Sequence, residues 1–347
     1  MKRKTKGSTK KARLLAWKRR GSVCIGGYAG CKNLGDDAIL LGYLSSLSYD
    51  QRQRVTVLSG SPREDRRRFL VRCVGRKNPF SVALAMLRSE RFLCGGGSLL
   101  QNRSGRLSLL YYLALLRMAR LFGCRTELFS SGIGPIIGEK NERRVARELA
   151  ECERIEVRDA ESYRYLRSLG IEEMRLAMSP DAALRLALPP PSRLRYLRHE
   201  LGMGQSEDYF CLALTRPREH SEILLQTVSA ALGIFLKKHR LTPIFLVFDR
   251  REDVEFQTRI AKRIGGRVVI PRDAGEAMAW LSDARLLVGM RLHAILFARM
   301  TATPCIGISP SPSEPKLKSI CRTAGEPCFS PDHLSTVLLL SNMEEVL

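Results

Sequence analysis

The chain has 347 residues, of which 44% are hydrophobic and 7% aromatic, and its formal net charge at pH 7 is +23. This length allows two globular domains, and no apolar run reaches the roughly 18 residues that a membrane-spanning helix needs. The N-terminus has no apolar segment with a small-residue cleavage site, which argues against a secretory signal and favours a cytoplasmic protein.

The first segment, residues 1–20, is strongly basic. Half of its residues are Lys or Arg and none is acidic, so that we expect a disordered tail available to an anionic surface. The rest of the chain is also basic and rich in arginine, which suits the recognition of phosphate and carboxylate groups. An anionic lipid, a nucleic acid or a phosphorylated substrate fits this charge, and so does a solvated basic surface with no such partner.

Strands and helices alternate along residues 21–169. Strands are predicted at 21–27, 55–59, 91–94, 127–131 and 154–157, and helices at 36–47, 107–122, 141–150 and 160–169. The helix at 107–122 is amphipathic because Arg117 and Arg120 interrupt its apolar run. This alternation predicts a parallel sheet with helices on both faces, whose ligands lie at the carboxyl ends of the strands.

The proline-rich segment 188–195 breaks the pattern and is the best candidate for a domain boundary. The alternation then restarts, with strands at 209–214, 243–248, 268–270, 284–288 and 303–308 and helices at 222–239, 253–264, 275–282 and 293–299. We therefore predict a basic tail (1–20), an N-terminal α/β domain (21–190) and a C-terminal α/β domain (191–347). The expected fold is α/β, with two Rossmann-like parallel-sheet domains facing a cleft, as in GT-B enzymes.

The ten cysteines lie mostly in apolar, strand-like runs and form no CxxC pair. We interpret them as reduced, structural thiols. The sequence therefore predicts neither a disulfide framework nor a metal site.

Glycine-rich turns follow three predicted strands of the first domain. The first turn contains Gly26 and Gly27 and continues through Asn33 and Gly35 to Asp36; its spacing matches neither GxxxxGK[ST] nor GxGxxG. The other two turns contain Gly95, Gly96, Gly97, Ser98 and Gln101, and Gly132 and Gly134. Such turns let a ligand approach the backbone, although Asp36 as a helix N-cap and the glycines as plain sharp turns are the structural alternatives.

In the second domain, the segment Met290–Ala294 (MRLHA) follows an apolar strand and opens a helix. Arg291 is placed to bind a carboxylate or phosphate, and His293 to transfer a proton. A structural histidine is the alternative. Arg158–Asp159 and Ser179–Asp181 are weaker signals, for which a structural pair or cap is the preferred interpretation.

These segments resemble, in this order, the polysaccharide pyruvyl transferase family, which includes cell-wall enzymes of the CsaB type. The resemblance runs from about Ser22 to about Ile308 and rests on GGYAGCKNLGDDAIL, CGGGSLLQ, SSGIGPI, VRDAES, SPDAAL and GMRLHAILFA. The chain departs from the family at residues 309–316 (SPSPSEPK), where the family usually has a tyrosine, aspartate, proline and lysine stretch, and in its basic tail.

The resemblance implies transfer of a pyruvyl group from phosphoenolpyruvate to two hydroxyls of a hexose, which gives a cyclic ketal and phosphate. Such chemistry needs an acid, a base and cations for the donor. We assign Arg291 to the donor anion and His293 to proton transfer or phosphate contact, with Arg216 and Lys316 as further cations. Asp36 is the candidate base, the glycine turns bind substrate, and no cofactor or metal is expected.

The resemblance also implies an acceptor sugar that is linked to a lipid or polymer and made at the cytoplasmic membrane. From its charge, we predict that the basic tail, residues 1–20, holds the enzyme loosely at the inner face of this membrane. A homo-oligomer is compatible with the sequence. A GT-B glycosyltransferase using a nucleotide sugar is the main alternative. A nucleic-acid-binding protein would explain the charge but not the glycine turns, and no specific nucleic acid is expected.

Overall fold

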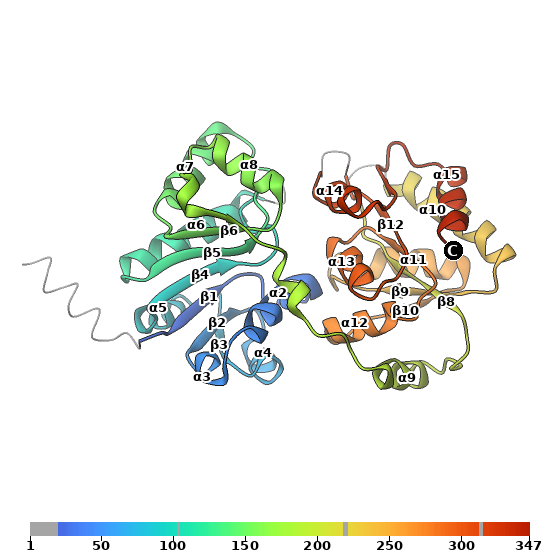
Figure 1. Ribbon diagram of the computed structural model, residues 1–347, viewed down its shortest axis with the longest axis horizontal. Coiled ribbons are helices and arrows are strands. Elements are labelled where there is room, and N and C mark those ends of the chain that lie inside the picture. Colours follow the sequence, from blue (N-terminus) through green and yellow to red (C-terminus); the bar gives the residue numbers. More distant parts are fainter. Residues whose placement is uncertain (1–19, 103–104, 218–220, 312–314) are drawn as a thin grey trace, which may run out of the picture. The chain divides into compact units, whose positions relative to one another are not determined.

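The computed structural model describes residues 20–102, 105–217, 221–311 and 315–347, and the predicted disordered tail therefore lies almost wholly outside the described residues. The chain forms two compact units (Figure 1). Among the described residues, the first unit comprises residues 20–31 and Asp36–Leu186, and the second comprises Lys32–Gly35 and Ala187–Leu347. The short segment Lys32–Gly35 thus packs with the second unit although its neighbours on both sides belong to the first.

The first unit is built on a sheet of seven parallel strands. Apolar β-branched and aromatic side chains fill its central strands, as expected for a sheet covered on both faces. In spatial order the strands are β3 (Arg72–Gly75), β2 (Val55–Ser59), β1 (Val23–Gly26), β4 (Arg91–Gly95), β5 (Arg125–Ser131), β6 (Arg154–Val157) and β7 (Leu176–Met178).

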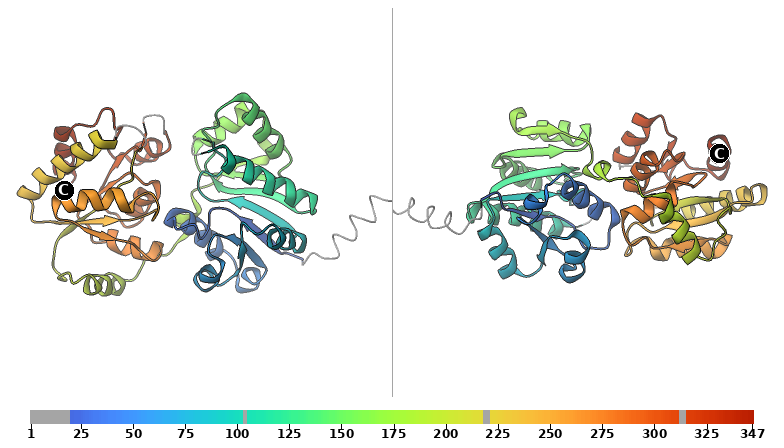
Figure 2. Two further views of the ribbon diagram at one scale, coloured as in Figure 1. Left: turned by 180° about the vertical axis from the view of Figure 1, so that it is seen from behind. Right: turned by 60° about the horizontal axis from the view of Figure 1, so that its bottom comes forward.

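Helices flank this sheet (Figure 2), and local signals set several of their starts. Pro62 and Pro79 occupy the first turn of their helices, where a missing N–H costs nothing. Asn78 and Asp159 are N-caps of the helices that begin at Pro79 and Ala160, and their side-chain oxygens accept from backbone amides of the first turn. The helices are α2 (Leu34–Ser45), α3 (Tyr49–Arg52), α4 (Pro62–Phe69), α5 (Pro79–Arg88), α6 (Arg106–Leu121), α7 (Glu139–Ala150) and α8 (Ala160–Ser168), with 3₁₀ turns at Glu173–Arg175 and Ala182–Arg185.

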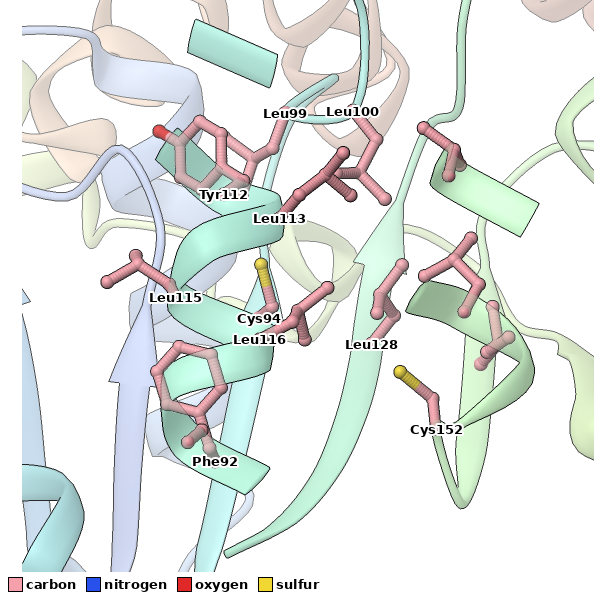
Figure 3. Packing of buried hydrophobic residues seen from close by; sticks show 14 of the residues in the cluster. Phe92, Cys94, Leu99, Leu100, Tyr112, Leu113, Leu115, Leu116, Leu128 and Cys152 are labelled. Carbon is pink, nitrogen blue, oxygen red and sulfur yellow. The ribbon is translucent and has the colours of Figure 1, made fainter. Parts of the chain in front are cut away.

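The core of the first unit lies between α6 and the centre of the sheet. Figure 3 shows Phe92 and Cys94 of β4 packed beside Leu115 and Leu116 of α6. Each of these side chains is buried, and burying a leucine or phenylalanine side chain contributes roughly 1.5–3 kcal/mol to folding. This packing fixes the strand ends from which the glycine turns leave.

The second unit has a six-stranded parallel sheet. Its strands, in spatial order, are β10 (Arg267–Val269), β9 (Thr242–Leu246), β8 (Tyr209–Ala213), β11 (Leu287–Gly289), β12 (Cys305–Ile308) and β13 (Cys328–Phe329). Its helices are α9 (Pro191–Glu200), α10 (Ser221–Lys238), α11 (Val254–Ile264), α12 (Ala274–Leu281), α13 (Leu292–Met300), α14 (Pro315–Ala324) and α15 (Thr336–Val346).

Alternating side chains of β8 serve the two faces of this sheet. Phe210 packs in the cluster formed with α10, α11 and α15, with its ring centroid 5.6 Å from that of Phe235. Tyr209 instead stacks edge-on against Trp280, at 5.6 Å, and its hydroxyl donates to the Trp280 carbonyl over 2.7 Å. Helices therefore cover both faces, as the alternation predicted.

The predicted α/β class with two parallel sheets is confirmed, but several elements were not predicted. Among them, β3 and β7 are short edge strands, and α14, β13 and α15 extend the C-terminus. The proline-rich segment 188–195 is not extended throughout, because Pro191 opens α9. No described helix is long and apolar enough to cross a membrane. The cysteines are free thiols, all buried except the half-buried Cys328.

Candidate functional site

The glycine-rich turns of the first unit lie side by side. They leave the carboxyl ends of β1, β4 and β5, which are neighbours in the sheet. The Gly132 amide donates to the Gly97 carbonyl over 2.9 Å, and the Gly134 amide donates to the Leu100 carbonyl over the same distance. The structure thus brings the predicted turns into one continuous edge, where parallel sheets bind ligands.

Three of the predicted glycines serve the packing of this edge. A side chain at Gly26 would meet the Phe92 ring at 2.6 Å, and one at Gly27 would meet the Gly95 carbonyl oxygen at 2.4 Å. A side chain at Gly95 would in turn overlap the Phe129 ring at 2.2 Å. These glycines allow neighbouring strand ends to approach one another.

Asp36 lies against the second glycine turn. A Cβ atom at Gly97 would be 2.2 Å from Oδ1 of Asp36, and Gly96 and Gly97 both have positive φ, at 92° and 59°. Asp36 is half-buried and lies in the first turn of α2, which begins at Leu34. The N-cap alternative for Asp36 is therefore wrong; the Asn33 Oδ1 atom accepts from the Gly35 amide at 3.0 Å instead.

The neighbouring Asp37 has a structural role. Its buried carboxylate accepts from the Gly30 amide at 2.9 Å and pairs with Arg68. Burial raises the pKa of Asp37, and the Arg68 charge acts in the opposite direction. This pair holds the loop between β1 and α2 in place, whereas Asp36 lies against the second glycine turn.

In the second unit, Arg291 is held by two acidic side chains. Its Nη2 atom contacts Glu252 at 2.9 Å and also pairs with Asp253, whose Oδ1 accepts from Nε at 3.1 Å. Asp253 is fully buried, Arg291 is 20% exposed and Glu252 is 63% exposed. Burial would lower the pKa of Arg291, but Asp253 and Glu252 more than offset this and keep it charged.

Asp253 links this arginine to the loop after β9. Its Oδ2 atom accepts from the amides of Phe248 and Asp249, at 3.1 and 2.7 Å. Burial raises the pKa of Asp253, while Arg291 lowers it. Asp253 is thus the buried counter-ion that fixes Arg291, and Glu252 is the exposed one.

The segment Lys32–Gly35 packs on the same loop of the second unit. The Asn33 side chain donates to Asp249 Oδ2 over 3.1 Å, and the Leu34 amide donates to the Phe248 carbonyl over 2.8 Å. His293 lies directly on Gly35, because a Cβ atom there would be 2.1 Å from Nδ1 of the imidazole. Asn33, Gly35, Arg291 and His293 are therefore gathered in the second unit, as parts of one arrangement.

The remaining predicted residues have different surroundings. Arg216 follows β8 and is exposed, whereas Lys316 is buried at the start of α14. Ser98 and Gln101 are half-buried in the segment after Gly97. Residues 312–314 of the atypical segment 309–316 lie outside the described residues.

The weaker signals combine into one structural unit. Arg158 and Asp181 form a nearly buried ion pair, with Nη1 and Oδ2 2.6 Å apart and side-chain exposures of 7% and 5%. Asp181 also accepts from the Ala183 amide at 2.9 Å, and Asp159 caps α8 by accepting from the Ser162 amide at 2.7 Å. The preferred structural interpretation of these residues is consistent with these contacts.

Sequence reasoning missed Asp253 and Glu252, which lie 38 and 39 residues before Arg291. An Asp at the start of a predicted helix was the only local signal. Among the residues that the structure describes, no group of three or more His, Cys, Asp or Glu could hold a metal ion.

The family of the chain follows from a comparison with known protein families. Residues 33–312 match the family described as polysaccharide pyruvyl transferase. The chain belongs to this family. The matched region includes Gly35, Asp36, Arg291 and His293, and the family is one of transferases in polysaccharide biosynthesis. None of the curated proteins compared with the chain matched its sequence.

Solved structures share the fold. A UDP-GlcNAc 2-epimerase from Methanocaldococcus jannaschii has a TM-score of 0.63 at 10% identity, covering 94% of this chain and 92% of that one. A glycosyltransferase from Rickettsia africae ESF-5 has 0.61 at 8%, covering 94% and 88%. ADP-heptose LPS heptosyltransferase II from E. coli has 0.53 at 12%, covering 94% and 98%. This member of the family therefore has a GT-B-like fold of two parallel-sheet domains.

Proposed function

We propose that the protein transfers a pyruvyl group from phosphoenolpyruvate to two hydroxyls of a hexose, in a cell-surface glycan or its lipid-linked precursor. The observation that carries this proposal is the family match over residues 33–312. The products are a cyclic ketal and inorganic phosphate. The first domain takes the acceptor and the second takes the donor.

The reaction needs two proton movements. Protonation of the phosphoenolpyruvate methylene creates an oxocarbenium-like centre at the adjacent carbon, and one sugar hydroxyl attacks it. The carbon–oxygen bond to phosphate then breaks, and the second hydroxyl closes the ketal. The two hydroxyl protons are balanced by the new methyl group and by the departing phosphate, so no cofactor is consumed.

Arg291 and His293 are the donor residues in this proposal. The contact between Arg291 and the exposed Glu252 is readily exchanged for a donor carboxylate or phosphate, because an exposed ion pair contributes only about 0–1 kcal/mol. Asp253 stays in place and keeps the guanidinium oriented. His293 protonates the methylene or contacts the phosphate, with its imidazole positioned by Gly35.

Asp36 is the acceptor residue in this proposal. Its carboxylate lies against the positive-φ glycines of the second turn, at the sheet edge where ligands bind, and it accepts a proton from the attacking hydroxyl. The neighbouring turns provide backbone groups for the sugar. Arg216 and Lys316 serve as additional cations toward the donor, and no metal takes part.

A thermal-shift comparison tests the donor. We expect phosphoenolpyruvate to raise the Tm of the wild type, and to raise that of Arg291→Gln much less. UDP-glucose is the matched competitor, since the chain shares its fold with nucleotide-sugar enzymes. Stabilisation by UDP-glucose and not by phosphoenolpyruvate would contradict the proposal and favour a glycosyltransferase.

We further propose that the basic tail, residues 1–20, holds the enzyme at the inner face of the membrane. Each cation near an anionic leaflet contributes about 1 kcal/mol, and half of the tail is Lys or Arg. Full-length protein should co-sediment with anionic vesicles at low salt, and tail-deleted protein should sediment much less. Equal sedimentation of the two would remove this role.

A further inference from the structure

Arg76, which is not among the residues assigned to phosphoenolpyruvate, is surrounded by three tyrosines. Arg76 follows β3, where its amide donates to the Ser59 carbonyl over 3.0 Å. Its guanidinium carbon lies 5.3 Å from the ring centroid of Tyr28, 4.9 Å from that of Tyr111 and 5.6 Å from that of Tyr112. We call these four residues the Arg76 cluster.

Hydrogen bonds fix the guanidinium within the cluster. Nη2 donates to the Tyr112 hydroxyl over 3.0 Å, and Nη1 donates to Sγ of Cys31 over 3.2 Å. The Tyr111 hydroxyl donates to the Arg76 carbonyl over 2.9 Å. Because guanidinium carries more N–H groups than these bonds use, further donors remain on a side chain whose position is already set.

Within the described part of the chain, no carboxylate lies within ion-pair distance of Arg76. Burial raises the pKa values of Tyr111 and Tyr112, so these phenols are neutral at pH 7. Other partly buried arginines of this unit do have an acidic partner: Arg68 with Asp37, Arg91 with Glu127 and Arg158 with Asp181.

The cluster adjoins the first glycine turn. Tyr28 directly follows Gly27, and the Tyr112 hydroxyl lies 3.5 Å from the Gly27 carbonyl oxygen. Tyr112 projects from α6 at this end of the core, as Figure 3 shows. Removing a cation from water costs free energy unless an anion pairs with it, and the neutral aromatic neighbours of Arg76 do not supply one. Aromatic faces are also suited to contact with a sugar ring.

We propose that the Arg76 cluster binds an oxyanion carried by the acceptor sugar, either a phosphate ester or the carboxylate of an acidic sugar. Arg76 supplies the charge and the directed N–H groups, and Tyr28 and Tyr111 form the walls. The word acceptor here rests on the proposed function, but the binding of an oxyanion at Arg76 does not. The Arg76 cluster belongs to the first unit and shares no residue with the Arg291 site, which belongs to the second.

Chemical footprinting of the full chain tests this site without any variant. Phenylglyoxal modifies accessible guanidinium groups, and peptide mass spectrometry measures the rate at Arg76 and at the exposed Arg72, which begins β3. Inorganic phosphate, pyrophosphate, glucuronate and neutral glucose are added separately. We expect protection of Arg76 by phosphates or by glucuronate, which identifies the source of the oxyanion, and no protection of Arg72.

Absence of modification at Arg76 under all conditions, equal protection by glucose, or no protection by either kind of oxyanion would overturn the proposal. Variants provide the second measurement: Arg76→Gln should weaken binding of the protecting anion by about tenfold or more, and Arg72→Gln should leave it unchanged. If Arg76→Gln does not fold, Arg76→Lys keeps the charge and should still weaken binding, since lysine lacks the planar fork. None of these measurements uses phosphoenolpyruvate or turnover, so their outcome is independent of the donor assignment.

Discussion

Replacing Gly35 with alanine should displace the imidazole of His293, to which we have assigned proton transfer, while leaving the fold intact. The new methyl group would lie 2.1 Å from Nδ1 of His293, 2.7 Å from Cγ and 2.8 Å from Cε1. Gly35 is not among the glycines with positive φ, and it lies in α2, where alanine is favoured over glycine by about 1 kcal/mol. The backbone therefore accepts the substitution, and the strain falls on the histidine.

The size of the effect follows from the overlap. Heavy atoms pack at about 3.5–4.0 Å, so the imidazole must retreat by roughly 1.5 Å. A displacement of about 1 Å at a reacting group costs on the order of a hundredfold in rate, which is about 2.7 kcal/mol in the activation free energy. We expect Gly35→Ala to reduce kcat by about that factor.

The assay is phosphate release from phosphoenolpyruvate in the presence of acceptor, with Tm measured on the same samples. Gly233→Ala is the matched control, because Gly233 lies in α10 with no atom within 4 Å of the added methyl group. His293→Ala should also lose activity, and adding Gly35→Ala to it should cause little further loss, since both changes remove the same group.

Full turnover by Gly35→Ala would show that catalysis does not require the imidazole of His293 at its present position. Additive losses in the double variant would show that Gly35→Ala does not act through His293. A large fall in Tm would mean instead that the alanine disturbs the backbone.

Four further substitutions test the remaining assignments. Glu252→Gln should lower the KM for phosphoenolpyruvate in steady-state kinetics, because it removes the exposed carboxylate that competes for Arg291, and a raised KM would contradict this exchange. Asp253→Asn should lower the free energy of unfolding in urea by about 3 kcal/mol, because it removes the buried counter-ion of a largely buried arginine and leaves only the exposed Glu252; a change under about 1 kcal/mol would show that the buried pair is not needed. Arg158→Gln should destabilise to a similar extent but keep the activity of the folded fraction, whereas a selective loss of activity would indicate a role in the site. Gly97→Ala combines a positive φ with a 2.2 Å overlap on Asp36 and should reduce kcat more than KM, which acceptor titration would show.

The central strands could be predicted from the sequence because they are short apolar runs that end at glycines. The edge strands β3 and β7 could not. β3 begins with the exposed Arg72, and β7 contains the exposed Met178, because an edge strand has less apolar surface to bury. The helix α4 was not predicted for a related reason: only Asp65 and Phe69 of its residues are buried.

The site was predicted in part. Glycines after strands and the pair Arg291 and His293 are local patterns, and the parallel sheet then brings the turns together. Interactions between distant segments have no such signal, so the pairing of Arg291 with Asp253 and the enclosure of Arg76 by Tyr111 became visible only in the folded chain. The packing of the segment Lys32–Gly35 with the second unit is of the same kind.

The most direct test of pyruvyl transfer is to incubate the full-length protein with phosphoenolpyruvate and candidate glycans or lipid-linked hexoses, and to measure phosphate release together with the mass of the acceptor. We expect phosphate release that depends on acceptor, with one pyruvyl ketal gained for each phosphate. An acceptor that gains a hexose from a nucleotide sugar, with no reaction from phosphoenolpyruvate, would contradict it.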